Sequence, residues 1–403
     1  MTLTPTRRTF LKGSAVAAGA AAAVGTGGVT LSTLTNATPA GAATGTGRLV
    51  VVFLRGGQDH LSTVVPYTRP SYYAARPTIA IPANAVLDLD GEWGLHPAVP
   101  RLHSLYQAGR LGVVACVGNP AHDESHFGAQ DLWEYGATSL TGVSQGWIAR
   151  CLNATASPSD SVFRAITAAD RVDLSLRGYS ALGVGSIASF GLGGVSGRTT
   201  GLEPLLSHEY GGVAPVEVTG RRALDAIDEL GAVTGSNAND PVKRAFADLA
   251  TLFDRDLGVE VATINTYGWD THANMGTATT GSMRDLLAGL DSYLADFQAD
   301  LDARGVADVT TVVMTEFGRR YDQNGTGGLD HGNGMAMLVM GARVNGGHVY
   351  GTWEEPVVEH GARDVAATTD FRDVLGGLSA AVLGVSPTTI FPGHSYTPVG
   401  VVS

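Results

Sequence analysis

A long amphipathic segment between two apolar runs is the feature that most constrains the fold of this chain. Residues Ser282–Arg304 carry apolar side chains at helical spacing, and Gly305 follows as a helix stop. The flanking runs, Val259–Asn265 and Thr310–Met314, have the length and apolar content of strands. A strand, a helix and a second strand in this order form the crossover unit of a parallel sheet. We therefore expect an α/β fold.

Further apolar runs extend this pattern. The additional predicted strands are Arg48–Arg55, Leu111–Val117 and Met335–Met340. Continuous apolar strands are typical of sheets whose two faces are both covered. The predicted covering helices are Pro97–Ala108, Gly128–Tyr135, Pro241–Leu257 and Asp370–Leu383. The predicted fold class is α/β, with a mostly parallel central sheet and helices on both faces.

The middle of the chain is less regular, and we expect residues of about 150–258 to form a cap or insertion. A strand at Val162–Ile166 and a helix at Val218–Leu230 are predicted within it. Residues Gly178–Gly201 are rich in Gly, Ser and Ala, which favours loops and short strands that cover a site.

The N-terminus has the pattern of an export signal. Arg7 and Arg8 stand in the stretch TRRTFLK, an Ala- and Gly-rich segment follows, and Ala40-Gly41-Ala42 fits a cleavage site. We expect residues 1–42 to be a twin-arginine signal peptide and residues 43–403 to be the mature domain. The twin-arginine translocase is the expected partner, and the destination is the periplasm, the cell envelope or the extracellular space. The apolar segment is too rich in Gly and Thr to predict a stable membrane span.

The negative net charge argues against polyanionic partners. The formal net charge is -12 at pH 7, and removal of Arg7, Arg8 and Lys12 gives -12 - 3 = -15 for the mature chain. Such an acidic surface argues against binding to nucleic acid and to anionic membranes. The chain has 2 cysteines, which predict neither a disulfide framework nor a metal cluster.

Polar side chains follow several of the predicted strands. Glu316, the pair Arg319-Arg320 and, after a Gly-rich loop, Asp330-His331 all come after the strand at Thr310–Met314. Loops that leave the carboxyl ends of strands bind ligands in open α/β sheets, so these residues are candidates for chemistry. A Gly-rich surface turn is the alternative interpretation.

Two further strand exits carry candidate metal ligands. Asp59 follows the first predicted strand through Gly56 and Gly57, and it is either a ligand or the cap of a following helix. Asp270 and His272 follow Val259–Asn265, and residues at positions i and i+2 of an extended segment face the same way. A carboxylate with an imidazole suits zinc, manganese or iron better than calcium.

Ser125 stands where a helix is predicted to begin. A hydroxyl there meets exposed backbone N–H groups, which suits a nucleophile that attacks an anionic ester. Ser is also a preferred helix cap, and on its own the residue favours that interpretation. His122, Asp123 and His126 crowd the same loop and bring the two interpretations level. The pattern leaves open whether Ser125 or His126 faces an ion.

Several motifs together resemble a known family of proteins. They are LRGGQD at 54–59, SHFGAQDLWE at 125–134, GWDTH at 268–272, TEFGRR at 315–320 and GLDHGNG at 328–334. The chain resembles a twin-arginine-exported bacterial domain-of-unknown-function family, which is similar to the alkaline phosphatase and sulfatase superfamily. The resemblance implies an alkaline-phosphatase-like domain. In it Ser125 would be the nucleophile and Asp59, Asp270, His272, Asp330 and His331 would surround one or two divalent ions. Where the superfamily usually has an Asp–His pair, this chain has Glu316-Phe317, so Glu316 can replace the Asp whereas Phe317 cannot bind metal.

These inferences predict an exported metal-dependent hydrolase of phosphate or sulfate esters. Ser125 or a metal-bound water would attack, and Arg319 or Arg320, with Arg55 as a further candidate, would hold the charge of the anion. The expected cofactor is one or two divalent ions of zinc, manganese or calcium, and the expected substrate is a small-molecule or polymeric anionic ester. The alternative is a non-catalytic exported protein that binds a metal or ligand in a degraded site. A structural role in the cell envelope is a third hypothesis.

Overall fold

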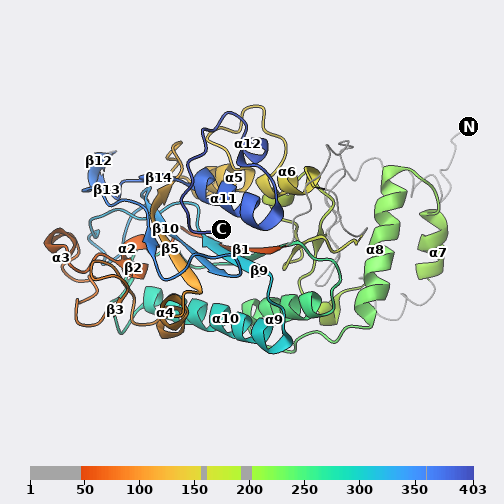
Figure 1. The fold of residues 1–403 in the computed structure, drawn as a ribbon, viewed down its shortest axis with the longest axis horizontal. Helices are drawn as coiled ribbons and strands as arrows, with labels where there is room; N and C mark the ends of the chain where they lie inside the picture. Colours follow the sequence, from red (N-terminus) through yellow and green to blue (C-terminus); the bar gives the residue numbers. More distant parts are fainter. Residues whose placement is uncertain (1–46, 156–160, 192–201, 360) are drawn as a thin grey trace, which may run out of the picture.

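A mostly parallel sheet of nine strands forms the centre of the computed structural model, which describes residues 47–155, 161–191, 202–359 and 361–403 (Figure 1). The strand order is β11-β5-β10-β9-β1-β8-β6-β7, and β14 pairs with β5. The strands are β1 (Arg48–Leu54), β5 (Leu111–Gly118), β6 (Ala165–Thr167), β7 (Leu182–Gly183), β8 (Val261–Thr266), β9 (Val309–Met314), β10 (Met335–Gly341), β11 (Val349–Tyr350) and β14 (Thr369–Asp370). Only β10 among them runs antiparallel to its neighbours, β5 and β9. The predicted fold class is confirmed.

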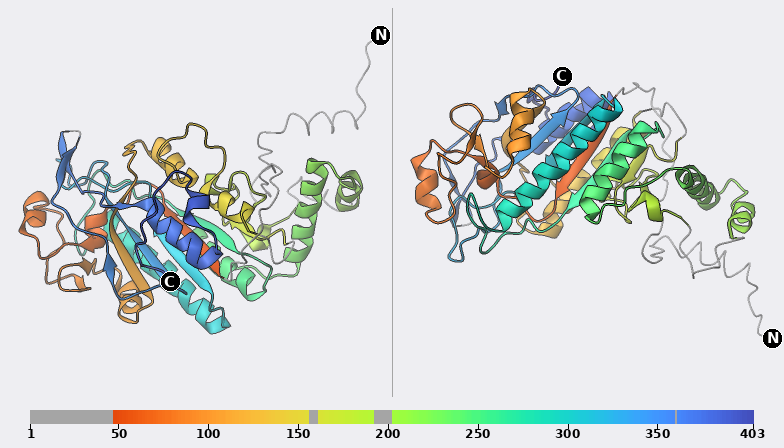
Figure 2. Two further views of the ribbon diagram at one scale, coloured as in Figure 1. Left: turned by 45° about the horizontal axis from the view of Figure 1, so that its top comes forward. Right: turned by 90° about the horizontal axis from the view of Figure 1, so that it is seen from below.

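Helices cover both faces of this sheet (Figure 2). One layer contains α4 (Pro100–Gln107), α9 (Pro241–Asp254) and α10 (Ser282–Arg304); the other contains α5 (His126–Tyr135), α6 (Trp147–Asn153), α11 (Phe371–Leu383) and α12 (Pro387–Ile390). Successive residues of β1 point to opposite faces, so Val50 and Val52 pack in the core with α10 whereas Val51 packs with α11. β1 is apolar throughout because its side chains are buried in two hydrophobic cores, one on each face of the sheet.

The direction of the strands places five loops at one edge of the sheet. β1, β8 and β9 are parallel, and β5 runs in the same direction because β10 lies antiparallel between β5 and β9. The carboxyl ends of β1, β5, β8 and β9 therefore share an edge with the beginning of β10. The loops at this edge are 55–59, 119–125, 267–272, 315–320 and 330–334.

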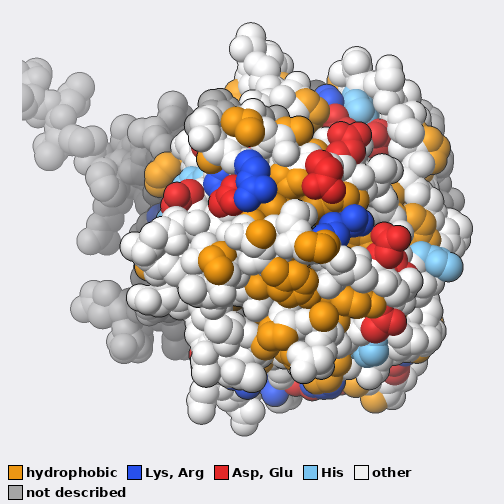
Figure 3. Space-filling view, turned by 90° about the vertical axis from the view of Figure 1, so that its left-hand side faces the viewer, with side chains coloured by type: hydrophobic (Ala, Val, Ile, Leu, Met, Phe, Trp, Pro, Cys, Tyr) orange, Lys and Arg blue, Asp and Glu red, His pale blue; other side chains and the backbone are white. Residues whose placement is uncertain are grey.

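Smaller elements surround this edge. The short helices α2 (His60–Thr63) and α3 (Pro70–Ala75) follow β1, with a small sheet of β2 (Val64–Val65), β3 (Leu87–Asp88) and β4 (Gly94–Leu95). A hairpin of β12 (Val357–Glu359) and β13 (Ala362–Asp364) precedes β14. On the side of the molecule where α3 and this hairpin lie, acidic and basic side chains are interspersed with apolar ones (Figure 3).

The region predicted as a cap or insertion is only partly separate from the sheet. β6 and β7 extend the sheet beside β8, and α9 packs on α10. Of two short 3-10 helices, η1 (Leu174–Leu176) lies between β6 and β7 in the chain, and η2 (Ile187–Ser189) follows β7. The pair α7 (Leu202–Glu209) and α8 (Pro215–Gly231) stands away from the sheet, at the end of the molecule opposite α3 (Figure 1).

Some predictions fall outside the described residues. They include the signal peptide at 1–42 and part of the Gly-rich stretch, namely 192–201. Among the residues that are described, no helix has both the length and the apolar character needed to span a membrane. Cys116 and Cys151 are both buried and unbridged.

Candidate metal centre

Three side chains from different loops converge at the edge where the strands end. His126 begins α5, Asp270 follows β8 and His331 precedes β10. One ligand atom from each of these residues lies within 4.8 Å of the other two. The Nε2 atoms of His126 and His331 are both 3.4 Å from Oδ1 of Asp270. The three residues therefore form a cluster around a carboxylate oxygen.

His272 adds a fourth potential ligand. Its Nε2 lies 3.1 Å from Oδ1 of Asp270 and 2.9 Å from Nε2 of His331. Two ligands bound to zinc at about 2.0–2.1 Å in a tetrahedral arrangement are about 3.4 Å apart. The distances from Asp270 to the three imidazoles, 3.1–3.4 Å, are close to that spacing. The donor set of three imidazoles and one carboxylate fits a divalent transition metal.

Each of these imidazoles is oriented by an oxygen at its other nitrogen. Nδ1 of His126 lies 2.8 Å from Oε1 of Glu316, and Nδ1 of His272 lies 3.1 Å from Oδ1 of Asp330. Nδ1 of His331 lies 2.7 Å from the backbone oxygen of Glu124. Because carboxylate and carbonyl oxygens accept hydrogen bonds, each Nδ1 is placed to donate its proton, and Nε2 is the ring nitrogen that faces the cluster. Metal-bound histidines in proteins are held in this way.

Glu316 was predicted to bind metal, but the structure places it behind His126. It is buried and accepts hydrogen bonds from the backbone N–H of Gly56 and the side chain of Gln130, both at 2.9 Å. Burial alone would raise the pKa of Glu316, yet the hydrogen bonds from His126 and Gln130 hold it below its usual value. Glu316 is therefore an anion that fixes the ring of His126. Asp330, also predicted as a ligand, holds His272 in the same manner.

Protons and metal compete for these histidines. The hydrogen bond to Glu316 raises the pKa of His126, whereas burial lowers the pKa of His331. Burial would raise the pKa of Asp270, but the hydrogen bond and the charge of Arg319 hold it below its usual value. Asp270 is thus an anion, and it supplies negative charge for a cation that competes with protons for the imidazoles.

Arg319 was predicted to hold a substrate anion, and the structure gives it other partners. Its Nη2 donates to Oδ1 of Asp270 at 2.6 Å, its Nε donates to the backbone oxygen of Gly57 at 2.6 Å, and its Nη1 donates to that of Leu329 at 3.1 Å. The side chain is fully buried. Arg319 therefore positions Asp270 and balances its charge.

The other predicted arginines lie in ion pairs. Arg320 contacts Glu124 and Asp364, which together with His122 form a second group of closely spaced ligand-type side chains. Arg55 lies 2.8 Å from Glu134 and 3.5 Å from Asp173. Each arginine is thus tied to carboxylates of the protein itself.

Asp59 lies in a buried ion pair and outside the converging ligands. Its oxygens accept from Nη1 and Nη2 of Arg76 at 2.6 and 3.0 Å, and the backbone N–H of Ser62 donates to Oδ2 at 2.7 Å. The carboxylate of Asp59 and the guanidinium of Arg76 are both fully buried. Asp59 caps α2, which agrees with the alternative interpretation of this residue.

Ser125 occupies the cap position of α5, and the residue after it enters the cluster. Ser125 is exposed and its side chain makes no cap hydrogen bond. The ring of the following His126 lies 4.4 Å from the ring of His331, measured between centroids. Of the two residues left open by the sequence, the structure brings His126 to the candidate ligands.

Phe317 supports the cluster although it cannot bind metal. Its ring lies 4.9 Å from that of His126 and 4.7 Å from that of His331. Gly57 has a φ of +70°, and a Cβ there would strike the ring of Phe317, so this turn requires glycine. Phe317 therefore forms an apolar wall that holds two imidazoles.

The backbone also fixes His331. The segments 318–320 and 330–333 pair with each other, with a β-bridge between Arg319 and His331 and a hydrogen bond from the N–H of Arg320 to the oxygen of Asp330 at 3.0 Å. Sequence reasoning did not find this pairing, because neither segment has a strand-like pattern. It also did not assign His126, whose only signal was its position beside Ser125.

Comparisons with known proteins agree with part of these predictions. A family model described as a protein of unknown function, DUF1501, matches residues 221–403, and a model of the twin-arginine translocation pathway signal sequence matches residues 4–30. No curated protein matches the chain. The chain is exported through the twin-arginine pathway, as the signal indicates.

Two solved structures of a protein called Ps i-CgsB show a distant similarity. The structure in complex with k-i-k-neocarrahexaose is 12% identical, and the one without it is 11% identical. Each alignment covers 86% of this chain and 74% of the other chain, with a TM-score of 0.41.

Proposed function

We propose that this chain is an exported metal-dependent hydrolase of phosphate or sulfate esters, with a single-ion centre formed by His126, Asp270, His272 and His331. The observation that carries the proposal is the convergence of three imidazole Nε2 atoms on one carboxylate oxygen at 3.1–3.4 Å. The oxygen-anchored Nδ1 atoms support it, because they leave each Nε2 able to bind a cation.

The donor set selects among the metals. Calcium takes about 6–8 oxygen ligands, whereas imidazole suits zinc, iron and similar ions. We therefore propose zinc first, with manganese or iron as substitutes, and regard calcium as the poorest fit. A divalent ion held by these four residues would polarise an ester oxygen and would lower the pKa of a water molecule.

Residues of the protein would admit the substrate, position the ligands and balance their charge. Asp270 and His272 are the most open members of the cluster, with side chains 47% and 42% exposed, so substrate approaches from their side. Glu316 and Asp330 hold imidazoles in place, and Arg319 neutralises part of the charge on Asp270. Ser125 is exposed and directly precedes His126, and we assign it as the candidate nucleophile.

The choice of phosphate or sulfate esters rests on motifs that resemble a twin-arginine-exported domain-of-unknown-function family, which is similar to the alkaline phosphatase and sulfatase superfamily. GWDTH contributes Asp270 and His272, and GLDHGNG contributes His331. His126 lies in SHFGAQDLWE, so all four proposed ligands stand in these motifs. The proposed reaction class is thus inferred from the resemblance to this family. The proposed metal centre is inferred from the distances between the four side chains.

The test combines metal analysis with activity measurements. The mature chain, purified without chelators, is expected to contain about one transition-metal ion and to hydrolyse an aryl phosphate or an aryl sulfate. Asp270→Ala should lose both the ion and the turnover. A chain that neither retains nor takes up zinc, manganese or iron, in wild type and variant alike, would rule out the centre.

One observation favours a second candidate, a non-catalytic exported binding protein. The arginines nearest the centre already donate to protein oxygens, and Arg319 in particular is fully buried. A centre of this kind can hold an ion without gripping a substrate anion. Full metal occupancy with no turnover on a broad panel of phosphate and sulfate esters would support this candidate.

A further inference from the structure

One side of α5 carries three polar residues at intervals of four positions, namely His126, Gln130 and Glu134. Residues at positions i and i+4 lie above one another on the same side of a helix, so the three side chains form a row. His126 at the start of the row is a proposed metal ligand. Gln130 and Glu134 therefore extend from the metal centre along the helix.

Gln130 and His126 contact the same carboxylate oxygen. Nδ1 of His126 lies 2.8 Å from Oε1 of Glu316, and Nε2 of Gln130 donates to that oxygen at 2.9 Å. Glu316 is 1% exposed, so its charge depends on the hydrogen bonds that it accepts. The backbone N–H of Gly56 adds two, at 2.9 and 3.1 Å. Gln130 thus belongs to the donors that keep Glu316 charged and beside His126.

The partner on the other side of Gln130 determines which way its amide points. Nη1 of Arg55 donates to Oε1 of Gln130 at 3.2 Å. A guanidinium has only donors and an ionised carboxylate has only acceptors, so the amide must turn its oxygen to Arg55 and its nitrogen to Glu316. A flipped amide would lose both hydrogen bonds.

Arg55 is itself held in place on two sides. Its Nη1 lies 2.8 Å from Oε1 of Glu134, the last member of the row on α5. Its Nε donates to Oδ1 of Asn265 on β8 at 2.7 Å. The side chains of Arg55 and Glu134 are only 10% and 6% exposed, so solvent screens this ion pair little. The guanidinium therefore gives Gln130 a fixed partner.

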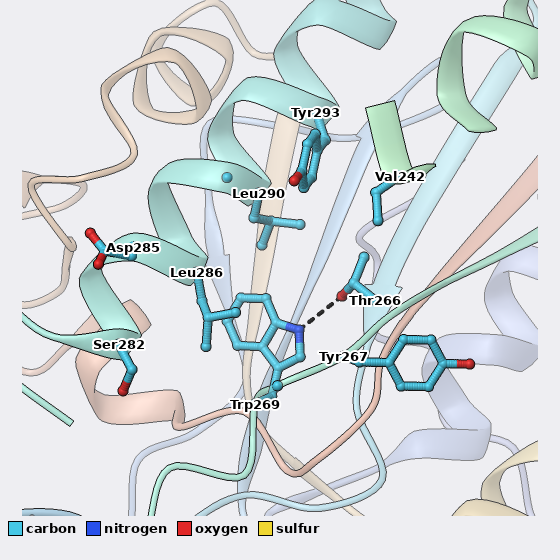
Figure 4. A pocket seen from close by; sticks show the side chains of 11 residues that line it. Val242, Thr266, Tyr267, Trp269, Ser282, Asp285, Leu286, Leu290 and Tyr293 are labelled. Atoms are coloured by element: carbon cyan, nitrogen blue, oxygen red, sulfur yellow. Dashed lines mark hydrogen bonds between the residues drawn. The ribbon is translucent and has the colours of Figure 1, made fainter. Parts of the chain in front are cut away.

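Arg55 also contacts the segment that leads to Asp270. Its backbone N–H donates to the oxygen of Thr266 at 2.8 Å, at the end of β8. Oγ1 of Thr266 accepts at 2.8 Å from Nε1 of Trp269, the residue before Asp270 (Figure 4). Arg55 thus lies between the helix that carries His126 and the strand whose loop carries Asp270.

We propose that Gln130 is a positioning residue of the metal centre: it holds Glu316 against His126, and Arg55 sets the direction of its amide. The inference deepens the proposed function, on which it rests, because it concerns binding of the ion at the same centre. Gln130 does not touch the ion, so its effect on metal affinity passes through Glu316 and His126.

Gln130→Met removes the donor and the acceptor while it keeps an unbranched side chain. Met and Gln have similar helix propensities, and Gln130 is only half-buried, so the variant should fold. Gln298→Met is the matched control. Gln298 is buried in α10, and its Nε2 donates to Oδ1 of Asp302 at 3.1 Å. A Cβ built on Gly341, where β10 ends, would lie 3.4 Å from Gln298, which places it at the edge of the sheet opposite the metal centre.

The first experiment measures zinc affinity of the mature chain by competition with a chelator. We expect Gln130→Met to weaken zinc binding about tenfold, the lower end of the range for residues behind a metal-bound histidine. Gln298→Met should bind zinc as the wild type does. Glu316→Ala removes the carboxylate through which Gln130 acts. In that background Gln130→Met should therefore weaken binding by less than about twofold, because residues that act through one another are not additive.

Two results of this experiment would overturn the inference. One is an affinity of Gln130→Met equal to that of the wild type. The other is an effect of Gln130→Met that remains undiminished in the Glu316→Ala background, which a side chain that only packs would produce.

The second experiment needs no metal. Exchange of the imidazole Nδ1 proton of His126 with water is followed by NMR on the metal-free chain, and the signal is identified by its absence from His126→Ala. The hydrogen bond to Glu316 should slow this exchange. We expect faster exchange in Gln130→Met and an unchanged rate in Gln298→Met.

Failure of this inference is distinguishable from failure of the proposed function. A wild type that binds no zinc would refute the proposed centre, and the exchange rate of the His126 proton would then decide the inference. Equal rates in wild type and Gln130→Met would overturn it, whereas faster exchange in the variant would support the hold of Gln130 on Glu316. Zinc binding that Gln130→Met weakens, in a chain that hydrolyses no ester, would support the positioning role while the hydrolase proposal fails.

Discussion

Nδ1 of His126 lies 2.8 Å from Oε1 of Glu316, although 190 positions separate the two residues. This hydrogen bond joins the start of α5 to the loop after β9. It turns Nε2 of His126 toward Asp270, 3.4 Å away. Glu316, which the sequence indicated as a ligand, therefore acts through His126, a residue whose role the sequence left open.

Glu316→Gln should weaken metal binding while leaving the ligands in place. The amide oxygen can still accept from His126, but the negative charge is lost, and substitutions behind a metal-bound histidine cost about 10–100-fold in affinity. Competition with a chelator of known affinity measures the change. Glu229→Gln, at an exposed position of α8, is the control. Equal affinities of the two variants would contradict a positioning role for Glu316.

His126→Ala and Ser125→Ala should differ in metal content. The two residues are neighbours at the start of α5, so the local backbone is the same for both substitutions. We expect His126→Ala to lose the ion during gel filtration and Ser125→Ala to retain it. Elemental analysis of the purified proteins provides the readout. If Ser125→Ala keeps the metal and also keeps full turnover, water and not the Ser125 hydroxyl is the nucleophile.

Removal of the metal should lower the thermal stability of the mature chain. A ligand that binds only the folded state stabilises it by about 2.7 kcal/mol when its concentration is 100-fold above Kd. We expect a chelator to lower Tm and added zinc to restore it. His126→Ala serves as control, and its Tm should respond to neither treatment. A wild-type Tm that is indifferent to both would argue against a folded-state metal site.

Asp59→Asn should destabilise the fold without releasing the metal. The substitution leaves the buried guanidinium of Arg76 without its carboxylate partner, and breaking a buried ion pair in this way costs about 3–5 kcal/mol. Denaturant unfolding measures this cost. The control is Asp322→Asn, which breaks the half-exposed pair with Arg363 and should cost about 1 kcal/mol or less. Loss of metal at unchanged stability would restore Asp59 as a ligand.

His96 should make the fold sensitive to mild acid. Burial lowers the pKa of His96 from 6.5 to about 4, so below pH 6.5 the unfolded chain takes up a proton that the folded chain does not. The free energy of unfolding therefore falls as the pH drops from about 6.5 to about 4, by about 3 kcal/mol. In His96→Asn, whose side-chain oxygen can still accept from the N–H of Ala98, the fall should be reduced by the contribution of His96, and His60, whose pKa burial also lowers to about 4, accounts for part of what remains.

Exposed His348 supplies the control for this pH effect. His348→Asn should retain the full dependence of the wild type. Denaturant unfolding at several pH values between 4 and 7 gives both curves. A wild type and a His96→Asn variant with parallel curves would show that another group causes the acid sensitivity.

The sheet was predictable because its strands are apolar on both faces and its longest helix has a clear stripe. β1, β8, β9 and α10 were all placed by these patterns. The direction of β10 was not predictable, because an apolar run does not indicate whether the strand is parallel or antiparallel to its neighbours. That direction comes from pairing with β5 and β9, which no local pattern encodes.

The sequence predicted which loops form the site, but it did not predict every side chain that points into it. Asp270, His272 and His331 were found because polar residues at strand exits meet in space. Which side chain of α5 points inward depends on the rotation of about 100° between successive helical residues, so Ser125 and His126 could not be separated. The partner of Asp59 could not be found either, because Arg76 lies in a segment without a distinctive pattern.

The position of His331 depends on the register in which the antiparallel strand β10 pairs with β5. His331 stands four positions before Met335, where β10 begins to pair with β5. A slip of one residue in this pairing would shift the strand by about 3.4 Å and exchange its two faces. That shift exceeds the length of a metal–nitrogen bond, about 2.0–2.1 Å. Metal occupancy would thus distinguish chains with the native strand alignment from misaligned ones before export.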